Sequence, residues 1–406
     1  MRTDARSARV LIYSHDTFGL GHLRRCRRIA QSLVARRKGL SVLILSGSPI
    51  IGSFDFRTRV DFVRVPGVIK LRNGEYSSLS LHMDISEVME MRASIIRHTA
   101  EVFSPDIFIV DKEPLGLRGE IQDTLVMLKE RGTLLVLGLR DVMDDPDLLA
   151  MEWERKNPMP ALRDLYDEIL VYGLPQVCNP LEGIDLPESV RRKITYTGYL
   201  RSTPPRVAPQ DSWEICNQGP FILVTPGGGG DGEQLINCVI SAYENDADIP
   251  YPALLVFGPF MHPRRRRSFR RRAARLGRVK AITFDTHVEQ LMDRASGVVA
   301  MGGYNTFCEI LSFNKRALIV PRRRPRMEQY VRTSRAAELG LVRMLENGEH
   351  NTPQAMAIAL RNLPTQPLPS DVVVPGLLEG LDNIQRLVDR WLDDEKSPRV
   401  ALASRA

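Results

Sequence analysis

The chain has 406 residues, a length that suits two domains of about 200 residues better than one hydrophobic core. Hydrophobic residues make up 43% and charged residues 26%, which is typical of a globular protein, and no apolar run approaches the roughly 20 residues that span a bilayer. The net charge is +7, but residues 264–280 carry nine arginines, Lys280 and no acidic residue, which leaves −3 for the rest of the chain. This local basicity argues against a protein that coats nucleic acid.

The N-terminal segment and the cysteines predict a cytoplasmic protein. Residues 1–9 lack the apolar core of a signal peptide. The cysteines are far apart, odd in number and never spaced C-x-x-C, which indicates neither a disulfide framework nor a zinc cluster. They are Cys26, Cys178, Cys216, Cys238 and Cys308.

The first half of the chain alternates apolar, strand-like runs with longer amphipathic stretches. The expected strands are residues 10–13, 41–45, 61–65, 106–110, 134–137, 169–172 and 194–199. Continuous apolar runs between helical stretches are typical of strands covered on both faces, and therefore of a parallel sheet. We expect an N-terminal domain over residues 1–200 and a linker over residues 201–219, where the polar, proline-rich stretch 202–210 lies.

The second half repeats this pattern and predicts a domain over residues 220–380. Its expected strands are residues 221–224, 253–257, 280–284, 298–300 and 317–320. Residues 381–406 form a C-terminal helix and tail, and whether the helix packs on the first domain is left open. In each half the first strand runs into a glycine-containing loop and then a helix. The predicted fold class is therefore α/β, with two Rossmann-like doubly wound domains facing a cleft.

Two glycine-containing loops in the second half are candidate diphosphate sites. In the first, Gly227, Gly228 and Gly229 allow backbone amides to approach a ligand without interference from a Cβ. This loop lacks the Lys-Ser/Thr pair of an ATP-binding P-loop and does not fit a dinucleotide fingerprint. Taken alone it is equally compatible with a tight turn, but a second loop follows the strand around residues 298–300.

At that second loop Gly302 and Gly303 end the strand and open a helix, so free N–H groups and the helix dipole favour phosphate. Thr306 and Glu309 are three residues apart and share one helix face, where a hydroxyl can meet phosphate and a carboxylate can accept from ribose hydroxyls. The alternative is a plain strand–helix joint. Downstream, Glu328 and Gln329 can bind sugar hydroxyls or simply begin a solvated helix.

The first half contains a candidate general base. His22 stands at a helix N-terminus after the loop that includes Gly19 and Gly21, where the dipole keeps an imidazole neutral. Asp111 closes the fourth apolar strand at the same sheet edge and is a candidate to orient the imidazole. A structural role for His22 is one alternative.

A second alternative for this loop is a dyad of His15 and Asp16, which precede His22 in the sequence. Both alternatives place the candidate base in the loop that follows the first strand.

The arginine-rich segment 264–276 places Phe269, Ala273 and Leu276 at i, i+4 and i+7, which predicts a helix with a narrow apolar stripe and a broad cationic face. The stripe can pack on its own domain. Alternatively the helix can dock on an anionic membrane surface or on nucleic acid, although no aromatic interleaving accompanies the charge.

The loop at residues 18–23, the segment 302–309 and the segment 328–330 together resemble glycosyltransferase family 28, whose type enzyme is the MurG-type transferase. The resemblance covers mainly residues 9–35 and 221–345. It implies the GT-B fold, with a UDP-sugar donor in the C-terminal domain and the acceptor in the N-terminal domain. The acceptor would be a sugar, a lipid-linked molecule or a polysaccharide.

By this resemblance Gly303 and Thr306 would contact the diphosphate, Glu309 the ribose, Gln329 the transferred sugar, and His22 would take the acceptor proton. No cofactor and no metal ion is expected, since the acidic D-x-D triplets of the chain, at residues 145–147 and 246–248, fall in stretches that look like loops. Backbone amides and arginines can balance the leaving-group charge instead.

The stretch Gly21-His22-x-x-Arg25-Cys26 is also similar to nucleotide-sugar hydrolases of the pseudaminic acid pathway, in which the histidine activates water. A non-catalytic nucleotide-sugar or polyanion binding protein is the third alternative. We expect a cytoplasmic location, with peripheral docking on the inner face of the membrane left open.

Overall fold

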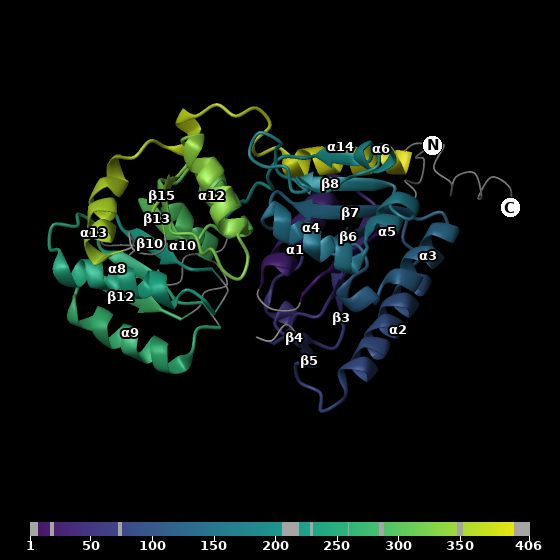
Figure 1. Ribbon diagram of the computed structural model, residues 1–406, viewed down its shortest axis with the longest axis horizontal. Helices are drawn as coiled ribbons and strands as arrows, with labels where there is room; N and C mark the ends of the chain where they lie inside the picture. The colour runs from purple at the N-terminus through teal and green to yellow at the C-terminus, as the bar shows by residue number, and fades with distance from the viewer. Residues whose placement is uncertain are drawn as a thin grey trace. The chain divides into compact units, whose positions relative to one another are not determined.

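The computed structural model describes residues 7–16, 20–71, 75–204, 219–227, 230–258, 260–283, 288–346 and 352–393. The chain divides into two units (Figure 1). Unit 1 comprises Met1–Pro175, Asn179–Leu200 and Glu379–Ala406, and unit 2 comprises Gln176–Cys178 and Arg201–Leu378. Most of the expected linker, residues 205–218, lies outside the described residues, as does the tail 394–406.

Unit 1 is built on a seven-stranded sheet with the order β3-β2-β1-β6-β7-β8-β9. The strands are β1 (Ala8–Ser14), β2 (Leu40–Ser46), β3 (Val60–Arg64), β6 (Ile107–Asp111), β7 (Leu134–Arg140), β8 (Glu168–Tyr172) and β9 (Ile194–Tyr196). Neighbouring strands pair in parallel throughout, as the apolar runs predicted. A short antiparallel hairpin of β4 (Val68–Lys70) and β5 (Tyr76–Ser78) was not predicted.

The helices of unit 1 cover both faces of this sheet. They are α1 (Gly21–Arg36), α2 (Ile85–Phe103), α3 (Gln122–Glu130), α4 (Pro146–Lys156), α5 (Met159–Asp164), α6 (Glu188–Arg191) and α14 (Gly380–Asp393). One face packs on α2 to α6 through Leu11 and Phe108, while the alternate side chains of the same strands are also fully buried. Helix α1 packs against β1 and β2, and α14 packs against α1. Strands buried on both faces explain their continuous apolar sequence.

The C-terminal helix α14, yellow in Figure 1, is held on unit 1 by contacts that the sequence left open. Arg37 Nη1 lies 3.0 Å from Asp389 Oδ1, and Asn383 Nδ2 donates to the carbonyl of Thr197. Gly380, the first residue of the helix, lies very close to the backbone of unit 1. A Cβ at this position would lie 2.5 Å from the carbonyl oxygen of Gly198, so only glycine fits without a shift. The helix therefore belongs structurally to the unit that the N-terminus begins.

The first D-x-D triplet does not lie in a loop, which corrects that interpretation. Asp145 is the N-cap of α4, its carboxylate accepts from the backbone N–H of Asp147, and Pro146 occupies the first turn. Proline and a capping carboxylate are the usual start of a helix. Asp145 is therefore engaged at a helix start.

Unit 2 contains a six-stranded parallel sheet with the order β12-β11-β10-β13-β14-β15. The strands are β10 (Ile222–Thr225), β11 (Ala253–Val256), β12 (Val279–Ile282), β13 (Gly297–Ala300), β14 (Ala317–Ile319) and β15 (Arg343–Met344). The two-residue β15 was not predicted. The α/β fold class with a parallel sheet in each half is confirmed.

The helices of unit 2 are α8 (Glu233–Asn245), α9 (Pro263–Arg275), α10 (Val288–Arg294), α11 (Tyr304–Ser312), α12 (Glu328–Glu338) and α13 (Pro353–Asn362). Phe269 and Ala273 on α9 are 5% and 2% exposed and belong to the hydrophobic core of unit 2. The apolar stripe of the arginine-rich helix thus packs on its own domain, as the first of the three interpretations predicted. None of the described helices is both long enough and apolar enough to cross a membrane.

Candidate functional site

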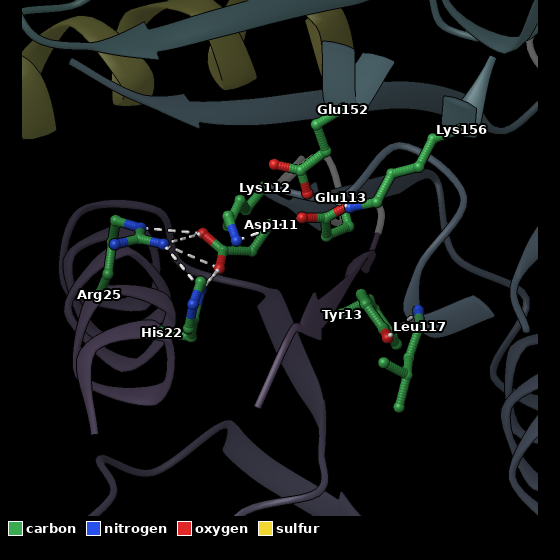
Figure 2. A network of polar contacts seen from close by, with 9 residues as sticks. All are labelled: Tyr13, His22, Arg25, Asp111, Lys112, Glu113, Leu117, Glu152 and Lys156. Carbon is green, nitrogen blue, oxygen red and sulfur yellow. Dashed lines mark hydrogen bonds and ion pairs between the residues drawn. The ribbon is translucent and has the colours of Figure 1, made fainter. Parts of the chain in front are cut away.

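The carboxyl ends of β1 and β6 bring His22 and Asp111 together, because these strands are neighbours in the sheet. His22 is the second residue of α1, and Asp111 is the last residue of β6. His22 Nδ1 lies 2.5 Å from Asp111 Oδ2 (Figure 2). The side chain of His22 is 17% exposed and that of Asp111 is 2% exposed, so the imidazole is reachable while its carboxylate partner is buried.

The surroundings of this pair fix its charge and its tautomer. Burial lowers the pKa of His22, and although Asp111 acts to raise it, the net pKa lies below the ordinary value. Burial raises the pKa of the Asp111 carboxyl, but Arg25 and His22 outweigh it and hold that pKa below its usual range. With Asp111 ionised, Nδ1 carries the hydrogen and donates it, which leaves Nε2 as a neutral proton acceptor. This is the arrangement that a general base requires.

The alternative dyad of His15 and Asp16 is not formed. Asp16 instead accepts from the backbone N–H of Leu23 at 3.2 Å and from Ser46 Oγ at 2.6 Å, so it holds the first turn of α1. His15 is 6% exposed, and its Nδ1 has no hydrogen-bond partner within the described ranges. Its ring meets that of His22 edge-on, with the centroids 5.7 Å apart.

Two buried groups beside the pair were not predicted from the sequence. Lys112 follows Asp111 with a φ of 71°, a left-handed conformation that is uncommon for a side chain other than glycine. Its Nζ lies 3.2 Å from Glu113 Oε1, and Lys156 Nζ lies 2.8 Å from Glu113 Oε2 (Figure 2). Backbone strain of this kind gathers at functional sites. No local pattern identifies Lys112, because lysine itself does not favour this conformation.

In unit 2 the loops after β10, β13 and β14 lie at one sheet edge, since these strands are adjacent and parallel. Gly302 ends β13 with a φ of +79°, and a Cβ there would lie 2.8 Å from both Ile319 Cγ2 and Thr333 Oγ1. Gly303 is the N-cap of α11 with a φ of −60°, and nothing lies within 4 Å of a Cβ at that position. The space beside Gly303 at the start of α11 is therefore open, and a phosphate bound at a helix N-terminus needs such space.

The side chains predicted around this cradle are buried. Thr306 and Glu309 on α11 are 8% and 1% exposed. Glu328 and Gln329 open α12 and are each 7% exposed, so the alternative of a solvated helix start is wrong for them. Polar groups in such surroundings form stronger hydrogen bonds than at the surface.

Arg322 connects the predicted loops. Its guanidinium contacts the carboxylates of Asp231, in the first glycine loop, and of Glu328, and its backbone N–H donates to Gln329 Oε1 at 3.2 Å. Gly227 has a φ of +87° in the same loop. The other predicted glycines Gly228, Gly229 and Gly19 lie outside the described residues, whereas Gly21 is the exposed first residue of α1.

Comparisons with known proteins show what unit 2 and the whole fold resemble. Residues 221–368 match the family model described as the glycosyltransferase family 28 C-terminal domain. The chain is a glycosyltransferase, and the matched residues all lie in unit 2. A comparison with curated proteins gave no match.

Solved structures show that this glycosyltransferase has the GT-B fold of two Rossmann-like domains. A UDP-glucosyltransferase from Polygonum tinctorium aligns with a TM-score of 0.64 at 13% identity, covering 95% of this chain and 99% of that one. UGT71G1 of Medicago truncatula, complexed with UDP-glucose, aligns with a TM-score of 0.62 at 14% identity, covering 95% and 98%. MurG of Acinetobacter baumannii aligns with a TM-score of 0.56 at 11% identity, covering 94% and 99%.

Two buried arginines of the glycosyltransferase were missed as site residues. Arg25 contacts both His22 and Asp111, and its position three residues after His22 on a helix is a signal that could have identified it. Arg332 is fully buried and donates from Nη1 to the carbonyl of Gly302 at 2.9 Å, which supports the turn before α11. Arg332 lies in an ordinary amphipathic helix pattern, so nothing local distinguishes it.

Proposed function

We propose that this glycosyltransferase moves a sugar from a nucleotide-diphosphate donor, a UDP-sugar, to a hydroxyl group of an acceptor, with His22 as general base. The observation that carries the proposal is the contact between His22 Nδ1 and Asp111, which leaves Nε2 of a partly exposed side chain as a neutral proton acceptor. UDP is favoured as the nucleotide because structural neighbours are complexes with UDP or UDP-glucose. The acceptor would be a sugar, a lipid-linked molecule or a polysaccharide.

In the proposed step the hydroxyl proton of the acceptor passes to His22 Nε2 while the oxygen bonds to the anomeric carbon of the donor. The bond between that carbon and the diphosphate oxygen breaks, and nucleoside diphosphate leaves with the electron pair. Asp111 stabilises the imidazolium that forms, as a buried carboxylate does in other base–acid pairs. His22 then loses its proton to solvent.

Unit 2 would bind the donor through the groups gathered at its sheet edge. The N–H groups at Gly303 and the hydroxyl of Thr306 would contact the diphosphate, Glu309 the ribose, and Gln329 the transferred sugar. The amides of the first glycine loop, Gly227 to Gly229, would join them. Each of these contacts is supported by position and residue type.

We propose that no metal ion is needed, because the backbone amides and the guanidinium of Arg322 would balance the charge of the leaving diphosphate. Arg322 would exchange its contact with Asp231 for the phosphate oxygens. Addition of a chelator should then leave the rate unchanged.

Donor turnover tests the proposal directly. The protein is incubated with UDP-, dTDP- and GDP-sugars, with and without a cell lipid extract, and free nucleotide is measured. Release that requires the extract supports transfer. Release in water alone means that the same dyad activates water, and the protein is then a nucleotide-sugar hydrolase.

Two variants separate binding from chemistry. His22→Ala should leave donor affinity nearly intact and collapse turnover, whereas Glu309→Ala should mainly weaken the donor. His98→Ala, an exposed position on α2, is the matched control. Donor binding with no turnover by the wild type, or full activity in both variants, would contradict the proposal.

We further propose that α9 lets the enzyme dock on an anionic membrane surface. Arg264, Arg267, Arg271 and Arg275 recur at intervals of 3, 4 and 4 residues and are all exposed, so they form one stripe along the outer face of α9. Two other arginines of α9 form ion pairs with α8. Arg265 lies 3.1 Å from the carboxylate of Glu233, and Arg272 lies 2.6 Å from that of Glu244. Since the apolar side of α9 is buried, the docking would depend on charge alone.

Vesicle sedimentation tests this docking. The wild type should bind vesicles that contain phosphatidylglycerol, should not bind pure phosphatidylcholine, and should be released by salt. Replacing the four stripe arginines by glutamine should abolish binding. Replacing Arg163, Arg191, Arg192 and Arg386, four exposed arginines of unit 1, removes the same charge and should not. Equal loss in both quadruple variants would contradict a specific surface.

A further inference from the structure

Arg25 is the most deeply buried cation beside the proposed base, at 1% exposure. Its Nε lies 2.8 Å from Asp111 Oδ1, and its Nη2 lies 2.6 Å from Oδ1 and 2.8 Å from Oδ2 of the same carboxylate. The same Nη2 lies 3.1 Å from His22 Nδ1 (Figure 2). One guanidinium therefore contacts both members of the proposed catalytic pair.

The geometry makes Asp111 a shared acceptor. Its Oδ1 receives two donors of Arg25, and its Oδ2 receives both Arg25 Nη2 and the Nδ1–H of His22. A planar guanidinium that bonds both oxygens fixes the plane of a carboxylate, which a lysine ammonium cannot do. The plane of Asp111 in turn sets the direction in which the imidazole donates.

The charges explain why a cation is needed there. A buried carboxylate alone would stabilise the imidazolium form of His22, and a histidine that is already protonated cannot accept a proton from a hydroxyl. Arg25 opposes that effect on the pKa of His22. The three groups together carry no net charge while His22 is neutral.

Other charged groups also act on this pair. Lys112 after β6 acts on His22, as do His15 and Asp16 after β1. The thiol of Cys26 on α1 and the phenol of Tyr172 on β8 face Asp111 and are both held neutral by burial. Arg25 contacts both Asp111 and His22 directly.

We propose that Arg25 is a positioning residue for the His22 base: its guanidinium fixes the Asp111 carboxylate that holds His22 Nδ1–H, and its charge keeps the imidazole neutral in the resting enzyme. This inference rests on the proposed role of His22 as base. It predicts two separable effects, one of geometry and one of charge, which different substitutions at the same position isolate.

The titration of His22 in protein labelled at the histidine rings, followed by NMR, tests the charge effect without any need for activity. Arg25→Met should raise the pKa of His22 by about one unit or more, because Asp111 then acts on it unopposed. Arg25→Lys should leave the titration near that of the wild type. His22→Gln assigns the signal.

Arg92→Met is the structural control. Arg92 is also 1% exposed and forms a bidentate pair with Glu120, but it does not contact the imidazole. Its loss should destabilise the protein without shifting the titration of His22. If Arg25→Met and Arg92→Met both leave the titration unchanged, Arg25 has only a structural role and the inference is wrong.

Kinetic measurements test the effect of geometry, which is the fixed orientation of the Asp111 carboxylate. In Arg25→Met, the acid limb of the pH profile of kcat/KM should move to higher pH by the same shift that NMR shows for the pKa of His22. In Arg25→Lys, kcat should fall tenfold or more, while the acid limb and the KM for the donor stay unchanged. If Arg25→Met does not fold, Arg25→Gln removes the same charge and takes its place. An Arg25→Lys enzyme with full kcat would overturn the geometric part, whereas a shifted titration in a protein without turnover would contradict only the proposed function.

Discussion

His22 Nδ1 and Asp111 Oδ2 lie 2.5 Å apart although 89 residues separate them in the chain. They meet because α1 is the next element after β1 in the chain, and β6 is the neighbour of β1 in the sheet. A hydrogen bond from an imidazole N–H to an ionised carboxylate is charge-assisted, and it becomes stronger when His22 is protonated. Under the proposed function, the rate of proton transfer to His22 would depend on the charge of this one buried carboxylate.

Asp111→Asn should therefore lower turnover far more than donor binding. The amide keeps the size of the side chain but removes its charge and permits the wrong imidazole tautomer, so we expect kcat to fall by about 10²- to 10⁴-fold, the usual range for general base catalysis. Donor affinity, measured by calorimetry with UDP, should stay within about twofold. Asp123→Asn, on the exposed side of α3, is the control. Unchanged kcat in Asp111→Asn would rule out the dyad.

The adjacent glycines at the start of α11 should respond in opposite ways. Gly302→Ala forces an L-residue into a φ of +79° and places a Cβ 2.8 Å from Ile319 and Thr333, so we expect a loss of about 1–3 kcal/mol in the free energy of unfolding. Gly303→Ala has an ordinary φ and open space around its Cβ, so stability should change by about 0.5 kcal/mol or less.

The affinity for UDP distinguishes a binding site from a structural joint at this position. If diphosphate fills the open space at Gly303, the alanine variant should bind UDP at least tenfold more weakly although it is as stable as the wild type. Normal binding by stable Gly303→Ala protein would place the diphosphate elsewhere.

The ion pair of Arg92 and Glu120 should be a major determinant of stability in unit 1. The side chains are 1% and 0% exposed, Nε and Nη2 of Arg92 each lie 2.6 Å from the carboxylate, and Tyr13 Oη donates to the same group at 2.5 Å. Arg92→Met leaves a buried charge unpaired and should cost about 3–5 kcal/mol in urea unfolding. The double variant with Glu120→Met should recover much of that loss, since neither charge then remains. Additive losses would contradict direct coupling.

The two buried histidines, His15 and His22, should make the free energy of unfolding decrease in mild acid. Burial lowers the pKa of His15 well below its ordinary value and also lowers that of His22. The unfolded chain therefore binds more protons than the folded chain as the pH drops below about 6.5, the ordinary value for histidine, and the free energy of unfolding decreases there. Above that pH both states are neutral at these sites and the contribution is complete.

His15→Gln should flatten this dependence in urea titrations between about pH 5 and 7, because one of the buried groups no longer titrates. His98→Gln, at an exposed position of α2, should leave the slope as in the wild type. Equal slopes in all three proteins would show that His15 does not contribute.

All strands of the two large sheets except β15 could be predicted because burial on two faces requires continuous apolar runs, as in residues 107–110 and 298–300. The antiparallel pair of β4 and β5 and the short strand β15 could not, since their few pairs depend on neighbours rather than on their own composition. Residues 145–147 were misread because an acidic triplet looks the same in a loop and at a helix start.

The sequence by itself determined where most of the strands lie and which polar residues follow them, since hydrophobic periodicity and glycine act over a few residues. It thereby placed His22, Asp111 and the Gly302 turn at sheet edges. Only the tertiary structure decided that Asp16 holds α1 while Asp111 holds His22, and that Arg25 completes that pair. Those partners lie up to 89 residues apart, and the pairing of buried charges depends on which groups the fold removes from water together.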